Sequence, residues 1–204
     1  MRSIFKELLR GLIFFEWLDW LFNRVSLKLN RVAFCKGLVI NGRVYIRNKG
    51  VFKVGRNFRL NSGIRHNVIG GDSRSNFIVE REGKLIIGHF VGISNSTFIC
   101  HDSITIENSV LIGGGCKFYD TDFHSIVPSE RLQPYLNGML ETSYGAKSGP
   151  ILIKEGAWIG AHCILLKGVE IGRNAVIAAG SVVSKSIPEN EIWGGNPIRF
   201  IKKI

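Results

Sequence analysis

The sequence predicts a parallel β-helix, in which short strands and tight corners wind into stacked coils around one core. Three observations predict this fold class: a strict six-residue repeat in the C-terminal half, a looser form of the same repeat upstream, and the composition. The chain has 204 residues, of which 45% are hydrophobic, so it can build one core of ordinary size, and global disorder is excluded.

The strict repeat begins at Ile151, where the sequence divides into ILIKEG, AWIGAH, CILLKG, VEIGRN, AVIAAG and SVVSKS. The first position of each hexapeptide is mostly small or compact, and the third is a branched aliphatic. The third positions are Ile153, Ile159, Leu165, Ile171, Ile177 and Val183. An α-helix cannot use this period, because residues six apart are turned by about 120° around its axis. Short strands joined by corners can, because each side of a coil then turns one aliphatic inward and stacked coils pair as parallel sheets.

The looser repeat precedes it. Ile87, Ile93 and Ile99 are six apart, after which the phase slips by one residue to Ile106. The stretch 63–81 breaks the pattern and contains two adjacent glycines and several charges, so we expect a protruding loop there.

The N-terminal segment is rich in helix formers and bulky apolar residues. Over residues 2–10 the polar side chains share one helical face, but after Gly11 the polar stripe rotates, so we expect two helical pieces hinged near Gly11. The apolar run 12–22 contains two acidic residues and is shorter than the ~20 residues of a spanning helix. Two interpretations stay open: residues 1–30 lie on anionic lipid as an interfacial helix, or they pack against the body or a neighbouring subunit.

The excess positive charge is confined to the first part of the chain. Residues 1–36 carry seven Lys or Arg against three acidic residues, residues 37–81 carry nine against two, and residues 82–204 carry eleven of each. Such a block suits a polyanionic surface or a phosphorylated carrier. No nucleic-acid-binding module is recognisable, so nucleic acid is not expected as a partner.

The spacing of cysteines and histidines indicates the redox environment and bears on metal binding. The four cysteines are widely spaced and form no CxxC pair, which fits a reduced, cytoplasmic environment. No pair of histidines has metal-ligand spacing, so we expect no metal site.

The blocks AWIG, GVEIG, AAGSVVSK and GGNPIRFIKKI follow one another in the C-terminal part of the chain. In this order they resemble the hexapeptide-repeat acyltransferases, especially the branch of maltose and galactoside acetyltransferases and polysaccharide O-acetyltransferases. The resemblance covers residues 87–204 well and the earlier coils weakly. It implies a left-handed β-helix, an exception to the usual right-handed crossover, a homotrimer with active sites between subunits, and acetyl-coenzyme A (acetyl-CoA) as co-substrate. The expected parts are an N-terminal amphipathic helical segment at 1–35, the β-helix at 36–187 with an active-site loop at 123–150, and a coenzyme A-binding tail at 188–204.

The candidate base stands where the repeat breaks, in the sequence YDTDFHSI. Acetyl transfer from a thioester to a hydroxyl needs a group that takes the hydroxyl proton near neutral pH, and histidine suits that task. His124 matches the catalytic histidine of the resembled family by position. Asp122, or else Asp120, is the candidate carboxylate that orients the imidazole.

The resemblance also implies a coenzyme A site and an acceptor site. Small residues would leave a slot for pantetheine, and cations with one hydroxyl would hold the phosphates. The expected coenzyme A-binding residues are Ala161, Ala179, Gly180, Ser184, Lys185 and Arg199, with Lys202 as a further cation. The expected acceptor-binding residues are Asn95, Asp120, Tyr119 and Trp158. Trp158 has a second interpretation as an aromatic residue of the trimer interface, and no task is evident for Trp193.

The predicted function is an acetyl-CoA-dependent O-acetyltransferase that modifies a sugar hydroxyl of a glycan or lipid-linked glycan precursor. The basic first third and the apolar helix favour a lipid-linked or polymeric acceptor. The expected location is the cytoplasm, and the interpretation of residues 1–30 as an interfacial helix would place the protein at the inner face of the membrane. Two alternatives remain open. One is an N-acyltransferase acting on an amino-sugar nucleotide, and the other is a non-catalytic β-helix scaffold at the membrane.

Overall fold

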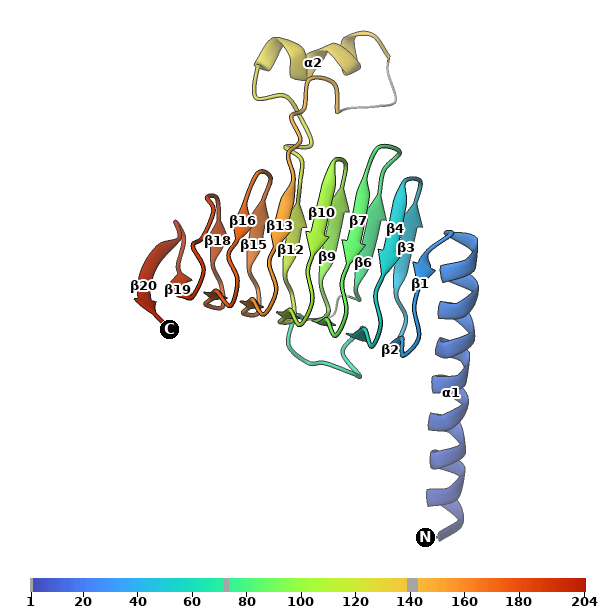
Figure 1. Ribbon diagram of the computed structural model, residues 1–204. Coiled ribbons are helices and arrows are strands. Elements are labelled where there is room, and N and C mark those ends of the chain that lie inside the picture. The colour runs from blue at the N-terminus through green and yellow to red at the C-terminus, as the bar shows by residue number, and fades with distance from the viewer. Residues whose placement is uncertain (1, 72–73, 139–142) are drawn as a thin grey trace.

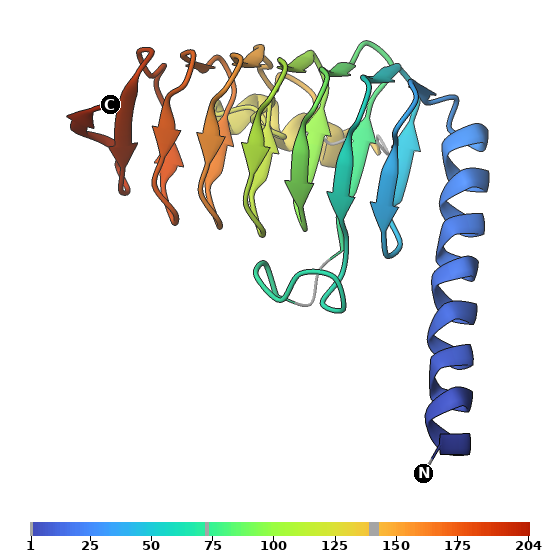
Figure 2. The same cartoon turned by 60° about the horizontal axis from the view of Figure 1, so that its bottom comes forward.

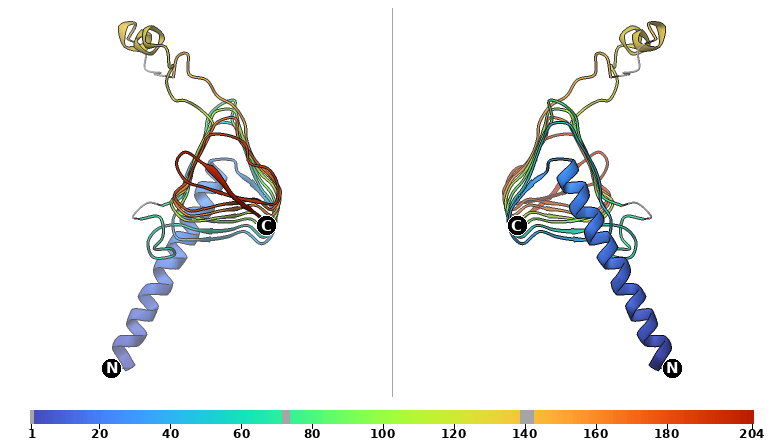
Figure 3. Two further views of the ribbon diagram at one scale, coloured as in Figure 1. Left: turned by 90° about the vertical axis from the view of Figure 1, so that its left-hand side faces the viewer. Right: turned by 90° about the vertical axis from the view of Figure 1, so that its right-hand side faces the viewer.

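The computed structural model describes residues 2–71, 74–138 and 143–204, and the side chains of its first helix from Phe15 onward. Three sheets wind around a single core, and the stack of coils is triangular in section (Figure 3). Their named strands pair in parallel, except for the final antiparallel pair β19–β20. Each coil passes through sheet A, then sheet B, then sheet C. The three edges of the stack are named below as the AB, BC and CA corners.

Sheet A and sheet C have six strands each, and sheet B has eight. Sheet A contains β1 (Ala33–Phe34), β4 (Val51–Val54), β7 (Lys84–Ile87), β10 (Ser103–Ile106), β13 (Ile151–Ile153) and β16 (Glu170–Ile171). Sheet B contains β2 (Val39–Asn41), β5 (Arg59–Asn61), β8 (Gly92–Ser94), β11 (Leu111–Ile112), β14 (Trp158–Ile159), β17 (Val176–Ile177), β19 (Glu191–Gly194) and β20 (Arg199–Lys203). Sheet C contains β3 (Tyr45–Asn48), β6 (Asn76–Val79), β9 (Thr97–Cys100), β12 (Lys117–Tyr119), β15 (Ile164–Leu166) and β18 (Val182–Val183).

The strict repeat forms the C-terminal coils as predicted. All six aliphatics at the third hexapeptide position are buried, and so are all six residues at the first position. The small first-position residues, such as Ala157 and Cys163, leave room inside a narrow triangular section. Sheet C adds a column of phenylalanine rings to this core. Neighbouring centroids in the series Phe52, Phe77, Phe98 and Phe118 lie 5.3, 5.0 and 4.3 Å apart.

Two details of the looser repeat differ from expectation. Ile99 lies on the outer face of β9, and the neighbouring Phe98 points inward. The core residue of this strand is therefore one position before the predicted one. The buried phenylalanines on both sides of Phe98 explain this register, because Phe98 pairs with Phe77 and with Phe118. The predicted loop 63–81 is also too long, since Asn76–Val79 form β6.

Two excursions leave the stack at different corners. The loop 62–75 leaves at the BC corner, and the longer excursion 120–150 leaves at the CA corner and carries α2 (Pro128–Leu136). In Figure 1 the longer excursion stands above the coils and the loop 62–75 hangs below them, and Figure 3 shows that they occupy different edges of the triangle.

The N-terminal segment is one continuous helix, α1 (Arg2–Leu29), so the predicted hinge at Gly11 is wrong. A glycine inside a helix costs only about 1 kcal/mol relative to alanine, and the helix formers on both sides of Gly11 offset that cost. No helix in the described part of the chain carries a stretch long and apolar enough to cross a bilayer.

Both ends of the core are capped. At the N-terminal end, Leu27 of α1 is 3% exposed and belongs to the core. The buried Asn23 donates to the Gly42 carbonyl at 2.8 Å and accepts from the Val44 amide at 3.2 Å. At the other end, Trp193 of β19 packs against the core, which gives this tryptophan the structural task that the sequence did not reveal.

Candidate active site

His124 lies at the CA corner, near the start of the excursion 120–150, and its side chain is exposed. The two chain segments that leave and re-enter the coils at the base of the excursion are bonded to each other just before His124. Thr121 and Ser148 form an antiparallel bridge, and the Asp122 amide donates to the Lys147 carbonyl at 3.0 Å. These bonds fix the base of the excursion, so His124 projects from a defined edge of the coil stack.

The residue after His124 is held by side-chain contacts. Ser125 is buried, its hydroxyl donates to the Glu130 carboxylate at 2.6 Å and accepts from the Val127 amide at 3.1 Å, and Arg131 donates to its carbonyl at 3.1 Å. Glu130 and Arg131 belong to α2, so the helix clamps the chain at Ser125. Sequence reasoning missed this clamp, because a serine and a glutamate five residues apart across Pro128 match no motif.

The residue before His124 is also constrained. Phe123 has a φ of 64°, in the left-handed region that a bulky side chain rarely adopts. Its ring packs against Tyr119, edge to face, with centroids 5.3 Å apart. Strained backbone of this kind persists only where the surroundings enforce it, and it clusters at functional sites.

Asp122 has two further interactions at this corner, besides the bond from its amide to Lys147. Its carboxylate forms an ion pair with Lys167 at 2.7 Å, and its carbonyl accepts the His124 amide at 2.7 Å. Lys167 comes from the next coil and was not predicted as a site residue, since a lone lysine at a coil corner carries no sequence signal. The carboxylate expected to orient the imidazole therefore forms an ion pair with a lysine.

Asp120 does not face a binding surface. It is fully buried, and its two carboxylate oxygens accept the backbone amides of His101 and Asp102, each at 2.8 Å. Burial raises the pKa of the Asp120 carboxyl above its usual value, although these two hydrogen bonds oppose the rise. Asp120 joins one coil to the previous one, so the acceptor-binding role expected for it is corrected to a structural one.

Asn95 is also buried, and it lies at the BC corner, away from His124. Its side-chain oxygen accepts the Gly63 amide at 2.6 Å, and its amide nitrogen donates to the carbonyls of Asn67 at 2.6 Å and Ile69 at 3.1 Å. Asn95 thus anchors the loop 62–75, and the acceptor contact expected for it is corrected in the same way.

The small residues expected to line the coenzyme A slot gather at the BC corner of the C-terminal coils. Ala161 and Gly180 come from consecutive coils, and the Gly180 amide donates to the Ala161 carbonyl at 2.8 Å. Ala179 and Gly180 are exposed and Ala161 is partly exposed. A Cβ added at Gly160 would lie 2.6 Å from the Ala179 nitrogen, so the coils stack closely here and present mostly backbone to the outside.

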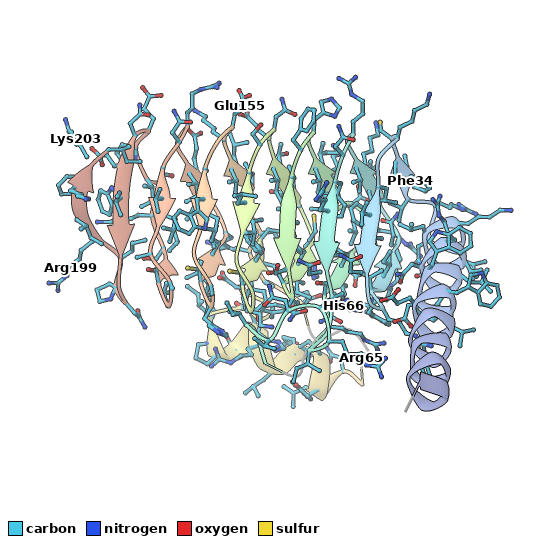
Figure 4. All side chains as sticks on the ribbon, turned by 90° about the horizontal axis from the view of Figure 1, so that it is seen from below. Phe34, Arg65, His66, Glu155, Arg199 and Lys203 are labelled. Atoms are coloured by element: carbon cyan, nitrogen blue, oxygen red, sulfur yellow. The ribbon has the colours of Figure 1, made fainter. Side chains whose placement is uncertain are left out.

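The expected phosphate-binding side chains lie near the C-terminal end of the stack. Lys185 is exposed, and its ammonium lies 4.9 Å from the ring centroid of Trp193. Ser184 precedes it and is exposed as well. Arg199 and Lys202 are exposed on β20, the last strand of sheet B. Figure 4 labels Arg199 beside Lys203 at this end, opposite α1.

Trp158 lies on the outer face of sheet B and is 54% exposed. In the register of this sheet it follows Leu111 and precedes Val176, which makes an apolar row across three coils. Sheet B is the side of the triangle opposite the CA corner, as Figures 1 and 3 show. Within one chain, therefore, Trp158 and His124 lie on opposite sides of the stack.

Comparison with known proteins agrees with this fold. The family described as "Bacterial transferase hexapeptide (six repeats)" matches residues 150–185. A Saccharomyces cerevisiae protein named as an acetyltransferase, YJL218W, is 33% identical over 141 residues, which are 66% of each chain. WbbJ of Escherichia coli K12, named for O-acetyl transfer in lipopolysaccharide biosynthesis, is 29% identical over 177 residues, 86% of this chain and 83% of WbbJ.

Among solved structures, a galactoside acetyltransferase in complex with coenzyme A superimposes with a TM-score of 0.59 and 25% identity. The match covers 89% of this chain and 69% of that one. The shared architecture is the left-handed parallel β-helix, which confirms the predicted fold class, including the N-terminal helix.

Proposed function

Because the chain belongs to the hexapeptide-repeat acyltransferases, we propose that it transfers an acetyl group from acetyl-CoA to a sugar hydroxyl, with His124 as the general base. The observation that carries this proposal is the placement of His124. It is an exposed histidine between a strained Phe123 and a clamped Ser125, on an excursion tied to the coil at its base. A base held in this way keeps a defined position toward a bound acceptor.

The proposed reaction is a direct transfer without an acyl-enzyme. The imidazole of His124 takes the proton of the acceptor hydroxyl while its oxygen attacks the thioester carbonyl. The carbon–oxygen bond forms and the carbon–sulfur bond breaks, and the proton passes from the imidazolium to the leaving thiolate. A backbone amide of a coil would stabilise the tetrahedral oxyanion.

We propose that a homotrimer completes the site. Within one chain His124 lies at the CA corner, whereas the small residues Ala179 and Gly180 lie at the BC corner. The excursion that carries His124 stands clear of its own coils (Figure 1) and exposes Ile126, Tyr135 and other apolar side chains. A neighbouring subunit would cover these side chains and bring its BC corner to His124.

Coenzyme A is proposed to bind along the BC corner, with its pantetheine beside Ala161, Ala179 and Gly180 and its phosphates near Lys185 and Arg199. We predict that Ala179→Trp weakens coenzyme A binding by at least about tenfold, equivalent to ~1.4 kcal/mol, because the indole would fill the space beside the backbone. Isothermal titration with coenzyme A measures this effect. The control is Ala33→Trp, at an exposed position of β1, and equal affinity of the two variants would place the cofactor elsewhere.

The proposed acceptor is a glycan or a lipid-linked glycan precursor, modified in the cytoplasm at the inner face of the membrane. Two observations support this choice: the net charge of +11, all of it arising before residue 82, and the similarity to WbbJ over 86% of the chain. A polymeric or lipid-linked acceptor carries phosphate or lies at an anionic surface, which such a basic region would attract.

The test of the proposed function is thiol release from acetyl-CoA in the presence of a panel of sugars, with mass spectrometry of the product before and after alkali. Acceptor-dependent thiol release and an alkali-labile acetyl group would support O-acetyl transfer. An alkali-stable product would identify an amide and overturn O-transfer. No thiol release with any sugar, together with no binding of acetyl-CoA in calorimetry, would replace the proposal by the scaffold alternative.

A further inference from the structure

The contacts of α1 define which side of this helix faces the body. Asp19, Asn23 and Leu27 are spaced four residues apart and therefore share one face. All three contact the body: Asp19 pairs with Arg43 at 2.6 Å, Asn23 bonds to the first coil, and Leu27 enters the core. The opposite face of α1 points away from the coils.

That opposite face is apolar. Trp17, Leu21 and Val25, also four residues apart, are 52%, 39% and 49% exposed. Phe22 and Leu29 are exposed on the flank of the same face. A surface helix of a globular protein normally turns its apolar stripe toward the core and its polar face to water. In α1 the polar Asp19 and Asn23 meet the body, together with Leu27 and with Trp20, which lines a groove against β2. The apolar face that carries Trp17, Leu21 and Val25 is left outside.

Cations border this apolar face. Arg24 and Lys28 are exposed on α1 itself, and the Arg24 guanidinium lies 5.5 Å from the ring centroid of Trp20. From the body, Arg43 lies 5.3 Å from the ring of Phe22, and Arg65 lies 5.3 Å from the ring of Phe15. Figure 4 labels Arg65 of the loop 62–75 and Phe34 of β1 on the side of the helix that faces the coils.

The position of α1 makes the apolar face accessible. The helix lies across the N-terminal end of the coil stack, and its first half extends past the edge of the triangle (Figures 2 and 3). The outward side of α1 therefore forms the N-terminal end surface of the molecule, and all the coils lie on the other side of the helix.

We propose that the outward face of α1, centred on Trp17, Leu21 and Val25, lies flat on an anionic bilayer and that the coil stack stands away from the membrane. The bordering arginines and Lys28 would contact lipid phosphates, while the tryptophans lie at the headgroup boundary. This inference rests on the proposed membrane location and does not depend on acetyl transfer.

Charge favours lipid over a second copy of the chain as the occupant of this face. Between Trp17 and Leu29 the sequence contains one acidic residue, Asp19, and it faces the body in its pair with Arg43. Two such faces packed together would bring cations such as Arg24 against cations, whereas anionic headgroups neutralise them.

The test is flotation of the full chain with phosphatidylcholine vesicles, with and without phosphatidylglycerol. We expect the wild type to float with the anionic vesicles and Leu21→Glu to lose binding by about tenfold or more. The matched control is Val51→Glu, which changes an apolar residue of β4 that is 39% exposed, as Leu21 is, and should bind as the wild type does. Wild-type binding by Leu21→Glu, or a loss of oligomer mass in this variant without vesicles, would overturn the proposal.

The orientation has its own readout, because the four tryptophans of the chain lie in two groups. Brominated lipids should quench the fluorescence of Trp17 and Trp20 and leave that of Trp158 and Trp193 unchanged, each pair being read after the other is replaced by phenylalanine. Quenching of Trp193, at the far end of the stack, would contradict the orientation. Thiol release with a soluble sugar acceptor tests the acetyl transfer separately from both experiments.

Discussion

Replacement of His124 by alanine is expected to lower kcat for acetyl transfer by about 10²–10⁴-fold, the usual contribution of a general base. The affinity for coenzyme A should stay within about twofold of wild type, because the proposed contacts to the pantetheine and the phosphates come from Ala179, Lys185 and the other slot residues and not from His124. Thiol release at saturating acetyl-CoA measures the first quantity, and calorimetry measures the second.

The matched control for this experiment is His101→Ala. His101 belongs to the same CA corner, one coil earlier, and only its backbone amide bonds to Asp120, so alanine keeps that bond. We expect this variant to retain wild-type kcat. A His124→Ala enzyme that also retains wild-type kcat would remove His124 from the mechanism and leave the acyl-transfer assignment to rest on the fold.

The sequence makes His124 the candidate base but does not show which contacts hold it in place. The six-residue period ends before the excursion, and the contacts that fix His124 depend on how the excursion folds back. Ser125 meets Glu130 because Pro128 begins a helix there, and Asp122 meets Lys167 because one coil returns beneath another. Such contacts depend on how the excursion folds back onto the coils, and a periodic sequence pattern does not specify that path.

The acceptor contacts expected for Asn95 and Asp120 rest on the family resemblance, which does not specify these contacts either. Each is a polar residue at a coil corner, and a sequence pattern does not distinguish a corner residue that faces a ligand from one that bonds to its own backbone. In the structure both residues are fully buried, and their side chains form hydrogen bonds with backbone groups. Buried polar side chains are nearly always satisfied in this way.

The coils themselves were predicted well wherever the repeat is strict, because the first and third hexapeptide positions all turn inward. The prediction was weaker where an aromatic replaces the aliphatic. Phe98 and Ile99 are both apolar, so periodicity alone could not decide which one faces the core. The phenylalanines of the adjacent coils decide it, since Phe98 stacks on Phe77 and Phe118 at 5.0 and 4.3 Å.

This stacking leads to the second large effect. We predict that Phe98→Ala lowers the free energy of unfolding by about 3–5 kcal/mol, the cost of removing a fully buried phenylalanine, measured by guanidinium chloride denaturation at matched protein concentration. The control is Phe90→Ala. Phe90 is 56% exposed at the AB corner, and its loss should change the free energy by only about 0.5 kcal/mol. Equal losses in the two variants would show that the phenylalanine column does not stabilise the fold.

The position of Phe98 also connects the core to the candidate active site. In a stack of coils each coil is stabilised mainly by its neighbours, and Phe98 supports Phe118 in β12. β12 ends at Tyr119, whose ring packs against Phe123 next to His124. We therefore expect Phe98→Ala to reduce acetyl transfer at temperatures where the protein is still folded, because the strand that carries the excursion loses the ring beneath it. The column of phenylalanine rings in the core would then also stabilise the CA corner, where His124 lies.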